Sequence, residues 1–258
     1  MFTKDLGESL QTSEAFFQSH LYAKVTRKNG DVEHRDLGSG LVTNVGVTAM
    51  MNDWNWASPA VAINTLKLMN WVATGTGATA AAATDIALQT LAAPTTANAV
   101  SGAQSNVSAA NLQKFQQITT INYTSSLGIT EWGLHSAQVL SATTGTPFTA
   151  GSATTGTVTG TPYTASTATV QGEQMLIVQD TTAASPFYGV ILSNTTSVLT
   201  VPAWYLVSNG TLSGVNPVNA DALLIKPVMW DHKVFSVINV NNGDSIQFTY
   251  LLTINSGG

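Results

Sequence analysis

Hydrophobic and polar residues alternate most regularly near the C-terminal end of the chain. Every second residue of 246–254 is apolar: Ile246, Phe248, Tyr250, Leu252 and Ile254. Polar residues fill most of the opposite face, as in a strand with one face buried. Asn242-Gly243 precedes this strand and is typical of a tight turn. The pattern predicts a β-hairpin over 229–255, with Phe248, Tyr250 and Leu252 in the core.

The first 36 residues differ in character from the rest. Apolar residues near helical spacing predict either a short helix over 4–19 or an arm that docks on a neighbour. Residues 20–37 predict two polar strands around the turn dipeptide Asn29-Gly30. These strands are either a solvated hairpin or a charged ribbon that binds a partner.

The middle of the chain predicts one helix and then strands. Residues 43–56 fit a helix with Thr43 as the N-cap. From Leu66 onward the pattern is that of strands, and Gly128 and Gly133 indicate bends or close backbone approach. Several short apolar runs separated by turn residues follow in 136–224, a Thr/Gly-rich segment.

These elements predict a mainly β protein: an antiparallel β-sandwich with one or two short helices and an inserted β subdomain. The expected organisation has three parts. They are an N-terminal arm and hairpin over 1–36, a core sandwich over 37–135 plus 225–258, and the inserted subdomain over 136–224.

Composition narrows the functional classes. Hydrophobic residues make up 44% of the 258, which allows a packed core, while charged residues make up only 9%. A neutral, hydroxyl-rich surface loses little on contact with a neighbour, because few charges must be desolvated. The net charge of -5 argues against a nucleic-acid partner, and no apolar run approaches a membrane span. The chain has no cysteine and no secretory signal pattern, which is consistent with synthesis in a reducing cytoplasm.

Candidate chemistry is weak, and we predict no catalytic residue, no metal and no cofactor. Glu131 and His135 have the spacing of helical metal ligands, but their segment is typical of a strand, where they would lie far apart. Asp231 and His232 are adjacent, and neighbours in a strand point to opposite faces, so a catalytic dyad is not expected. No phosphate-binding loop or nucleophile elbow occurs.

Four segments in a fixed order resemble virion proteins of tailed bacteriophages. They are LVTNVGVTAMMND at 41–53, WVATGTGATAAAATDIALQT at 71–90, LGITEWGL at 127–134 and GDSIQFTYLLTI at 243–254. The resemblance covers about half the chain, 37–135 and 229–258. Its most specific residues are Gly75, Gly77, Asp85, Leu88, Thr130, Glu131, Trp132 and Gly133. The chain departs from the pattern at Leu91 and Ala92, where an acidic residue is common, and at His135, where an aromatic is common.

The motif residues are expected to be structural. Gly75 and Gly77 permit a tight turn, and Asp85 caps a turn of helix that begins at DIALQT. Leu88 fills the core, and Glu131, beside a buried Trp132, accepts hydrogen bonds from a loop backbone.

The resemblance implies a non-enzymatic structural protein of the virion, made in the host cytoplasm. A capsid decoration (cement) protein is the first interpretation, with other virion subunits, either the major capsid protein or tail proteins, as partners. A homo-oligomer is expected, with a trimer as one candidate. In this interpretation the N-terminal segment contacts the partner through Phe16, Phe17, Arg27 and Lys28. The alternative is a tail-associated or receptor- or glycan-binding protein that uses the insert, with Tyr188, Trp204 and Tyr205 as stacking residues.

Overall fold

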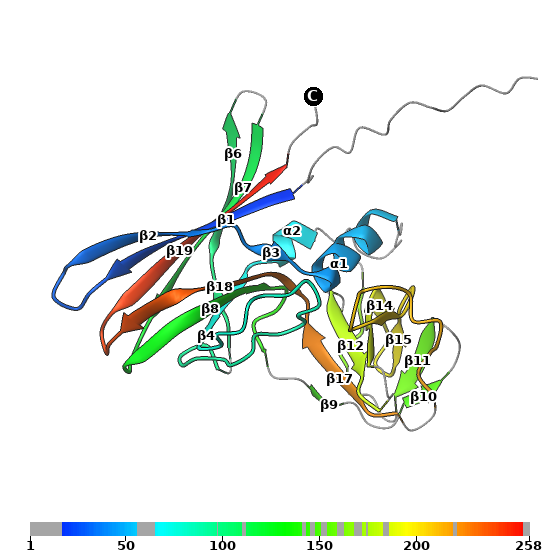
Figure 1. Cartoon of the computed structure of the whole chain (residues 1–258). Helices are drawn as coiled ribbons and strands as arrows, with labels where there is room; N and C mark the ends of the chain where they lie inside the picture. The colour runs from blue at the N-terminus through cyan, green and yellow to red at the C-terminus, as the bar shows by residue number, and fades with distance from the viewer. Residues whose placement is uncertain are drawn as a thin grey trace, which may run out of the picture.

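The computed structural model is mainly β, with four antiparallel sheets, as the sequence predicts (Figure 1). It describes residues 17–55, 65–96, 98–109, 112–140, 143–144, 148–150, 154–158, 163–167, 172–173, 175–182, 186–218 and 221–254. In these ranges no helix is both long and apolar enough to cross a bilayer.

The first sheet has five strands and contains both the N-terminal hairpin and the final strand. In spatial order its strands are β2 (Val32–Gly38), β1 (Phe17–Thr26), β19 (Ser245–Ile254), β7 (Leu112–Asn122) and β6 (Ala103–Ala109). The alternation predicted for 246–252 is confirmed, because Ile246, Phe248, Tyr250 and Leu252 are all buried. The two outer strands lie at opposite ends of the sheet. β2 pairs with residues 21–26 of β1, and β6 pairs with residues 112–118 of β7.

The second sheet also has five strands and faces the first. In order they are β3 (Leu41–Val42), β18 (Met229–Val240), β8 (Leu127–His135), β4 (Trp71–Gly75) and β5 (Val100–Ser101). β18 pairs with β3 and β8, whereas β19 pairs with β1 and β7. The predicted hairpin over 229–255 is therefore wrong. Gly243 does adopt a positive φ, but the turn leads the chain from one sheet to the other.

One hydrophobic core joins these two sheets into a sandwich. It takes Leu21, Val25 and Phe248 from the first sheet and Ile129 and Val240 from the second, together with many other buried residues. Trp132 of β8 stacks on Tyr250 of β19 across the interface, with ring centroids 5.3 Å apart. Inward-facing residues of both sheets thus form a single interior, as the period-two pattern requires.

The N-terminal hairpin belongs to this core, which corrects the predicted boundary at residue 36. β1 pairs with β19 along its whole length, and Leu21, Ala23 and Val25 are buried. The prediction of a solvated hairpin is therefore wrong for β1. Its three buried residues are small or medium apolar residues that alternate with polar ones, so the segment as a whole looked polar. Residues 17–19 are strand and not helix, and the rest of the predicted helix over 4–19 lies outside the described residues.

Two short helices lie between β3 and β4 in the chain. α1 (Asn44–Asn55) begins after Thr43, whose hydroxyl accepts a hydrogen bond from Gly46 N at 3.0 Å. The predicted N-cap is thereby confirmed. Val45, Ala49 and Met50 form the buried face of α1. α2 (Thr65–Leu68) is a single turn that leads into β4.

The third and fourth sheets are built from the segment between β8 and β18. The third contains β16 (Tyr205–Leu206), β13 (Phe187–Val190), β12 (Leu176–Asp180), β17 (Leu223–Pro227) and β9 (Thr143–Thr144). The fourth contains β10 (Phe148–Ala150), β11 (Thr155–Val158), β15 (Val198–Thr200) and β14 (Ser193–Asn194). The predicted boundary between 224 and 225 divides β17, all of which pairs with β12.

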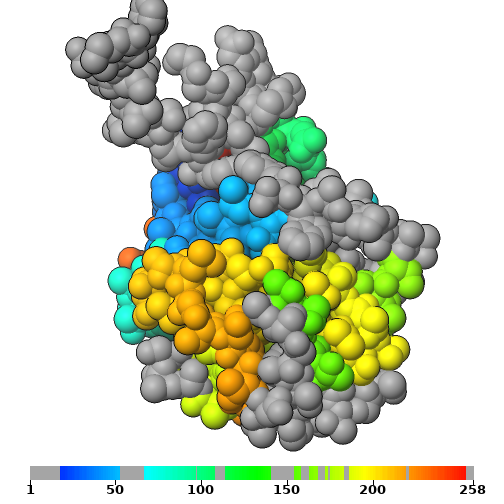
Figure 2. Space-filling view, turned by 90° about the vertical axis from the view of Figure 1, so that its right-hand side faces the viewer, coloured from blue at the N-terminus to red at the C-terminus, as the bar shows by residue number. Residues whose placement is uncertain are grey.

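These two sheets pack on each other and on α1. A second core with Val178, Phe187, Leu199 and Ile225 lies between them. The Tyr188 hydroxyl and Thr48 Oγ1 of α1 are 3.3 Å apart, within hydrogen-bond distance. Figure 2 shows the yellow and orange atoms of this region directly below the blue atoms of α1 and the N-terminal strands.

Candidate functional site

A buried carboxylate holds the loop of residues 75–91, called here the motif loop. Glu131 lies in β8 and its side chain is fully buried. Its Oε1 accepts a hydrogen bond from Gln89 N at 2.6 Å, and its Oε2 accepts bonds from Gly77 N and Thr90 N, both at 3.3 Å. The predicted role of Glu131 as an acceptor for a loop backbone is confirmed.

His232 of β18 joins Glu131 to Asp85 of the same loop. His232 Nδ1 lies 2.7 Å from Asp85 Oδ2, and Nε2 lies 3.0 Å from Glu131 Oε1. The imidazole and the Glu131 carboxylate are fully buried, and Asp85 is partly exposed. Both ring nitrogens face carboxylate oxygens, so both bonds form fully only when the ring carries two protons.

Within this Asp85–His232–Glu131 cluster, the pKa values of His232 and Glu131 agree with a charged imidazolium. Burial alone lowers the pKa of His232, but its hydrogen bonds to Glu131 and Asp85 outweigh that effect and hold the pKa above its ordinary value. Burial likewise raises the pKa of Glu131, but bonds from His232 and from the Gln89 and Thr90 amides lower it further than burial raises it. Each member therefore stabilises the charged state of its neighbour.

The chemistry open to this cluster is anchoring. With both nitrogens bonded to carboxylates, His232 has no free lone pair for a metal or for a substrate proton. Within the described part of the chain, no group of three His, Asp or Glu side chains has the geometry to hold a metal ion. The cluster instead ties the motif loop to the second sheet through four hydrogen bonds, three from loop amides to Glu131 and one between Asp85 and His232.

The motif glycines are required by the closeness of Glu131. A Cβ at Gly75 would lie 2.2 Å from Glu131 Oε2, and one at Gly77 would lie 2.7 Å from the same atom. Neither glycine has a positive φ, so the predicted tight turn is not the reason for them. A Cβ at Gly133 would lie 2.9 Å from both His135 Nε2 and Leu88 Cδ2, which confirms the predicted close approach.

The predicted role of Leu88 is confirmed, whereas that of Asp85 is not. Residues 85–90 form no helix, so the predicted capping role of Asp85 is wrong in that form. Asp85 Oδ2 accepts a bond from Ala82 N at 2.7 Å, which closes the turn before it. Leu88 is buried in a small core with Met229 and Ala99, as predicted.

Asp231 faces away from His232, as neighbours in a strand do. Its Oδ2 accepts a hydrogen bond from the Tyr250 hydroxyl at 3.1 Å, inside the sandwich. Trp230 Nε1 donates to the same hydroxyl at 3.0 Å, because a register shift between Met229 and Asp231 turns both side chains inward. Burial raises the pKa of Asp231 to about 6, although hydrogen bonds from Ser19 and Tyr250 oppose it.

His135 lies on β8 and not on a helix, as the sequence predicts. It is buried, and its Nε2 has no hydrogen-bond partner among the described residues. Burial lowers the pKa of His135 to about 3, so the ring is neutral at ordinary pH.

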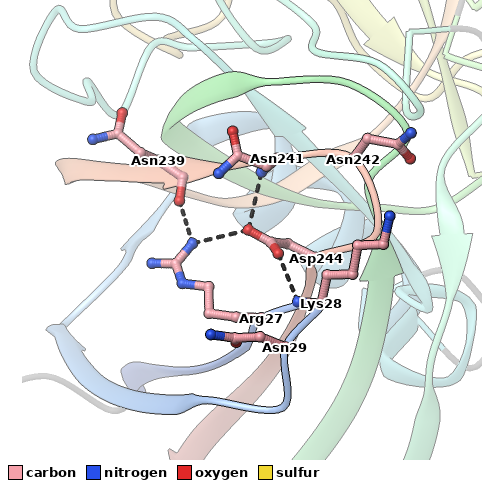
Figure 3. Close-up of a pocket in the computed structure, with 7 residues that line it drawn as sticks. All are labelled: Arg27, Lys28, Asn29, Asn239, Asn241, Asn242 and Asp244. Atoms are coloured by element: carbon pink, nitrogen blue, oxygen red, sulfur yellow. Dashed lines mark hydrogen bonds and ion pairs between the residues drawn. The ribbon is translucent and has the colours of Figure 1, made fainter.

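A groove of about 450 Å³ lies where the β1–β2 turn meets the β18–β19 turn (Figure 3). Its lining residues are Arg27, Lys28, Asn29, Asn239, Asn241, Asn242 and Asp244. Figure 3 shows Arg27 beside Asp244, and the two form an ion pair at 3.1 Å. Asp244 also accepts bonds from Lys28 N at 2.9 Å and Asn241 N at 3.0 Å. These bonds, the Lys28 amide first, hold the pKa of Asp244 below its ordinary value.

The residues predicted to contact a partner through the arm are placed unevenly. Phe16 and the side chain of Phe17 lie outside the described residues. Arg27 is engaged within the chain, since it bonds Asn239 O and pairs with Glu33 as well as Asp244. Of the cations predicted to dock, Lys28 is the one whose ammonium group has no partner among the described residues.

Two of the three residues predicted to stack on a glycan are inaccessible. Tyr188 is 1% exposed and Trp204 is 5% exposed. Tyr188 bonds Thr48, and Trp204 packs edge-on against Phe187 with centroids 5.5 Å apart. Tyr205 is partly buried and stacks on Tyr188. Tyr188 points inward from β13, and Trp204, which lies just before β16, packs in the second core, so this prediction is wrong for Tyr188 and Trp204.

The hairpin of β6 and β7, called here the ribbon, has an exposed outer strand. It extends beyond the body of the sandwich (Figure 1). Along β6, the residues Ala103, Ser105, Asn106 and Val107 are exposed, so both faces of the strand meet solvent. β6 contains no charged residue and pairs with β7 without a register shift.

The cluster and the open edge of the ribbon were both missed by reasoning from sequence. Asp85 and Glu131 are 147 and 101 residues from His232, and no spacing rule links them. The available signal was that Asp85 and Glu131 lie in two of the segments that carry the resemblance, and that His232 lies in the wider range 229–258 that it covers. For β6, the signal was a polar, charge-free run, AQSNVSA, next to the strongly alternating β7.

Comparisons with family models, with curated proteins and with solved structures found no match to the chain.

Proposed function

We propose that the protein is a non-enzymatic structural protein of a tailed-phage virion, and specifically a capsid decoration (cement) protein. The observation that carries this proposal is the ribbon: a projecting β-element whose outer strand is uncharged and exposed on both faces. Such a surface contacts a neighbour at little cost, because its hydroxyl and amide groups can exchange water for partner groups without charge desolvation.

Internal ion pairs support the same proposal. The Asp85–His232–Glu131 cluster and the Arg27–Asp244 pair fix loops to the sheets. A decoration protein needs a stable platform that presents contact surfaces, and charges used internally fit that requirement. The resemblance of 37–135 and 229–258 to phage virion proteins adds the biological setting.

The residues predicted for glycan stacking no longer favour the receptor-binding alternative, since Tyr188 and Trp204 are buried. A tail-associated protein uses the same kind of subunit contact and differs in location. The location of the protein in a particle distinguishes capsid decoration from tail association.

The test is to label purified particles with an antibody against the protein and to locate the label in electron micrographs. We expect label over the head surface. Label confined to the tail would replace decoration by tail association, and particles without the protein would contradict the proposal.

A second experiment examines the N-terminal segment. Because β1 begins at Phe17, the deletion that spares the sandwich removes residues 1–16. We expect the shortened protein to keep its circular dichroism spectrum and to enter particles less efficiently than the full chain. Equal incorporation would remove this segment from the contact.

A further inference from the structure

The outer strand β6 has an edge that lacks the usual protection against another chain. A strand at the edge of a sheet presents unpaired N–H and C=O groups and can pair with a further strand. Among the described residues, β6 has β7 on one side and no strand on the other. Lysine, proline, inward charges and bulges normally block such edges, and β6 has none of these.

The opposite edge of the same sheet is protected. β2 carries Glu33, Arg35 and Asp36, and its ladder with β1 contains a register shift near Tyr22. Arg35 bonds Glu33 and Val237 O, which ties β2 to the second sheet. The fold therefore blocks one edge of the first sheet and leaves the other open.

The sequence of β6 is compatible with pairing to a second copy of itself. In an antiparallel pair of AQSNVSA strands centred on Asn106, Ser105 lies opposite Val107, Gln104 opposite Ser108, and Ala103 opposite Ala109. Every position of such a pair is therefore occupied by an uncharged residue. No like charges would face each other, which is the usual obstacle to pairing two identical strands.

We propose that β6 pairs antiparallel with β6 of a second copy of this chain, with Asn106 on the two-fold axis. Because an antiparallel ladder alternates bonded and non-bonded pairs, a register centred on one residue satisfies the outward N–H and C=O groups of both strands. The two first sheets then become one continuous sheet across the dimer, and the contact is isologous.

This inference identifies the partner of the ribbon as a second copy of the chain. It rests on the proposed function in one respect, which is that the protein acts by contacting other subunits. Two-fold pairing joins protomers directly, whereas attachment to a different virion protein would use the same edge without self-association. The two ideas are therefore separable in solution, where no other virion protein is present.

The experiment is sedimentation velocity of the purified full chain over a concentration series, with charge variants at residue 106. We expect a monomer–dimer equilibrium for the unchanged protein. N106K and N106D should each weaken dimerisation by roughly tenfold or more, because like charges face each other at the axis. An equimolar mixture of N106K and N106D should recover the dimer, because opposite charges then face each other.

His34 on the exposed face of β2 supplies the matched control. H34K and H34D should sediment as the unchanged protein does, alone and mixed. A protein that stays monomeric throughout, a trimer, or a mixture of N106K and N106D that does not recover the dimer would overturn the inference. Dimerisation without incorporation into particles would contradict the proposed function and leave this inference standing. Incorporation into particles without self-association would contradict this inference and leave the proposed function standing.

Discussion

The two outer strands of the first sheet differ in how charge is used, although they belong to the same five-stranded ladder. β2 lies at the end near the groove in Figure 3, where its ionic side chains pair within the chain. β6 lies at the other end and has no ionic side chain. Of the 23 charged residues among 258, those of β2 form ion pairs that hold one edge of the sheet, whereas the edge strand β6 carries none.

Charge inside the second sheet follows the same rule as charge at β2. The Asp85–His232–Glu131 cluster anchors a loop that has little regular structure of its own. Surface ion pairs contribute little to stability, but buried, fully bonded ones cannot lose one member without leaving another uncompensated. The contribution of the charges to stability therefore depends on where they lie and not on how many there are.

The largest expected effect on the free energy of unfolding comes from a substitution in β19, the central strand of the first sheet. Phe248→Ala in β19 removes a buried ring between the two sheets, and we expect it to lower the free energy of unfolding by about 3–5 kcal/mol. Denaturant unfolding measures this change. Hydrogen exchange should accelerate in β1 and β7 together, because each pairs directly with β19. Acceleration in one alone would mean that the two edges do not share one cooperative core.

A slightly smaller effect is expected from Glu131→Gln. The substitution leaves the His232 imidazolium with one carboxylate, and we expect a loss of about 3 kcal/mol at pH 6. Denaturant unfolding of both proteins at several pH values checks it. A variant as stable as the unchanged protein at pH 6 would show that the cluster does not anchor the motif loop.

The same cluster gives the unchanged protein a defined pH dependence. The pKa of His232 is raised, so its contribution is complete below the ordinary histidine pKa of 6.5 and is lost as pH rises through the raised value. The pKa of Glu131 is lowered, so its contribution is complete above 4.5 and is lost as pH falls through the lowered value. The contribution of the cluster should therefore be greatest between about 4.5 and 6.5. In Glu131→Gln the loss at low pH should disappear and the loss at high pH should become smaller, because His232 then keeps only Asp85 as a carboxylate partner.

A moderate effect is expected where β2 approaches the β18–β19 turn. Asp244→Asn weakens the acceptor for two backbone amides and for Arg27, and we expect a loss of about 1 kcal/mol. Because the pKa of Asp244 is lowered, this contribution is present above 3.8 and disappears as pH falls through the lowered value. Faster exchange of the Lys28 amide, without change in β6, would show that the effect is local to this end of the sheet.

The smallest effect on stability is expected at the two edges themselves. Val107 of β6 and Val32 of β2 are 40% and 49% exposed, so Val107→Lys and Val32→Lys form a matched pair. We expect each to change the free energy of unfolding by less than about 0.5 kcal/mol. Only Val107→Lys should reduce self-association in sedimentation, because a lysine protects an edge that was open. If both variants reduced self-association equally, the proposed difference between an open β6 edge and a protected β2 edge would be contradicted.

The sequence predicted the class of fold and much of the local structure for clear reasons. The alternation around Phe248 and Tyr250 is strong because one face of β19 meets the core. The Thr43 cap could be read directly, because its partner Gly46 N is only three residues away. Local patterns with local partners are the features that a single sequence reveals best.

The failures have a common physical cause, which is pairing between distant segments. Asn242-Gly243 specified a turn but could not show that β18 and β19 enter different sheets. Tyr188 and Trp204 are aromatic whether they face a ligand or a core, and only the packing of the third and fourth sheets decides between these. His232 acquires its role from two carboxylates that lie far away in the sequence.

The most direct test of the account is a single-cysteine cross-link at the edge of the ribbon. Because the chain has no cysteine, Asn106→Cys introduces a unique thiol, and His34→Cys places one on the protected edge. In a two-fold pair of β6 strands, residue 106 faces its own copy. We expect mild oxidation to convert Asn106→Cys to a disulfide-linked dimer on non-reducing gels much faster than it converts His34→Cys. Equal rates for the two variants, or no dimer from Asn106→Cys, would contradict it.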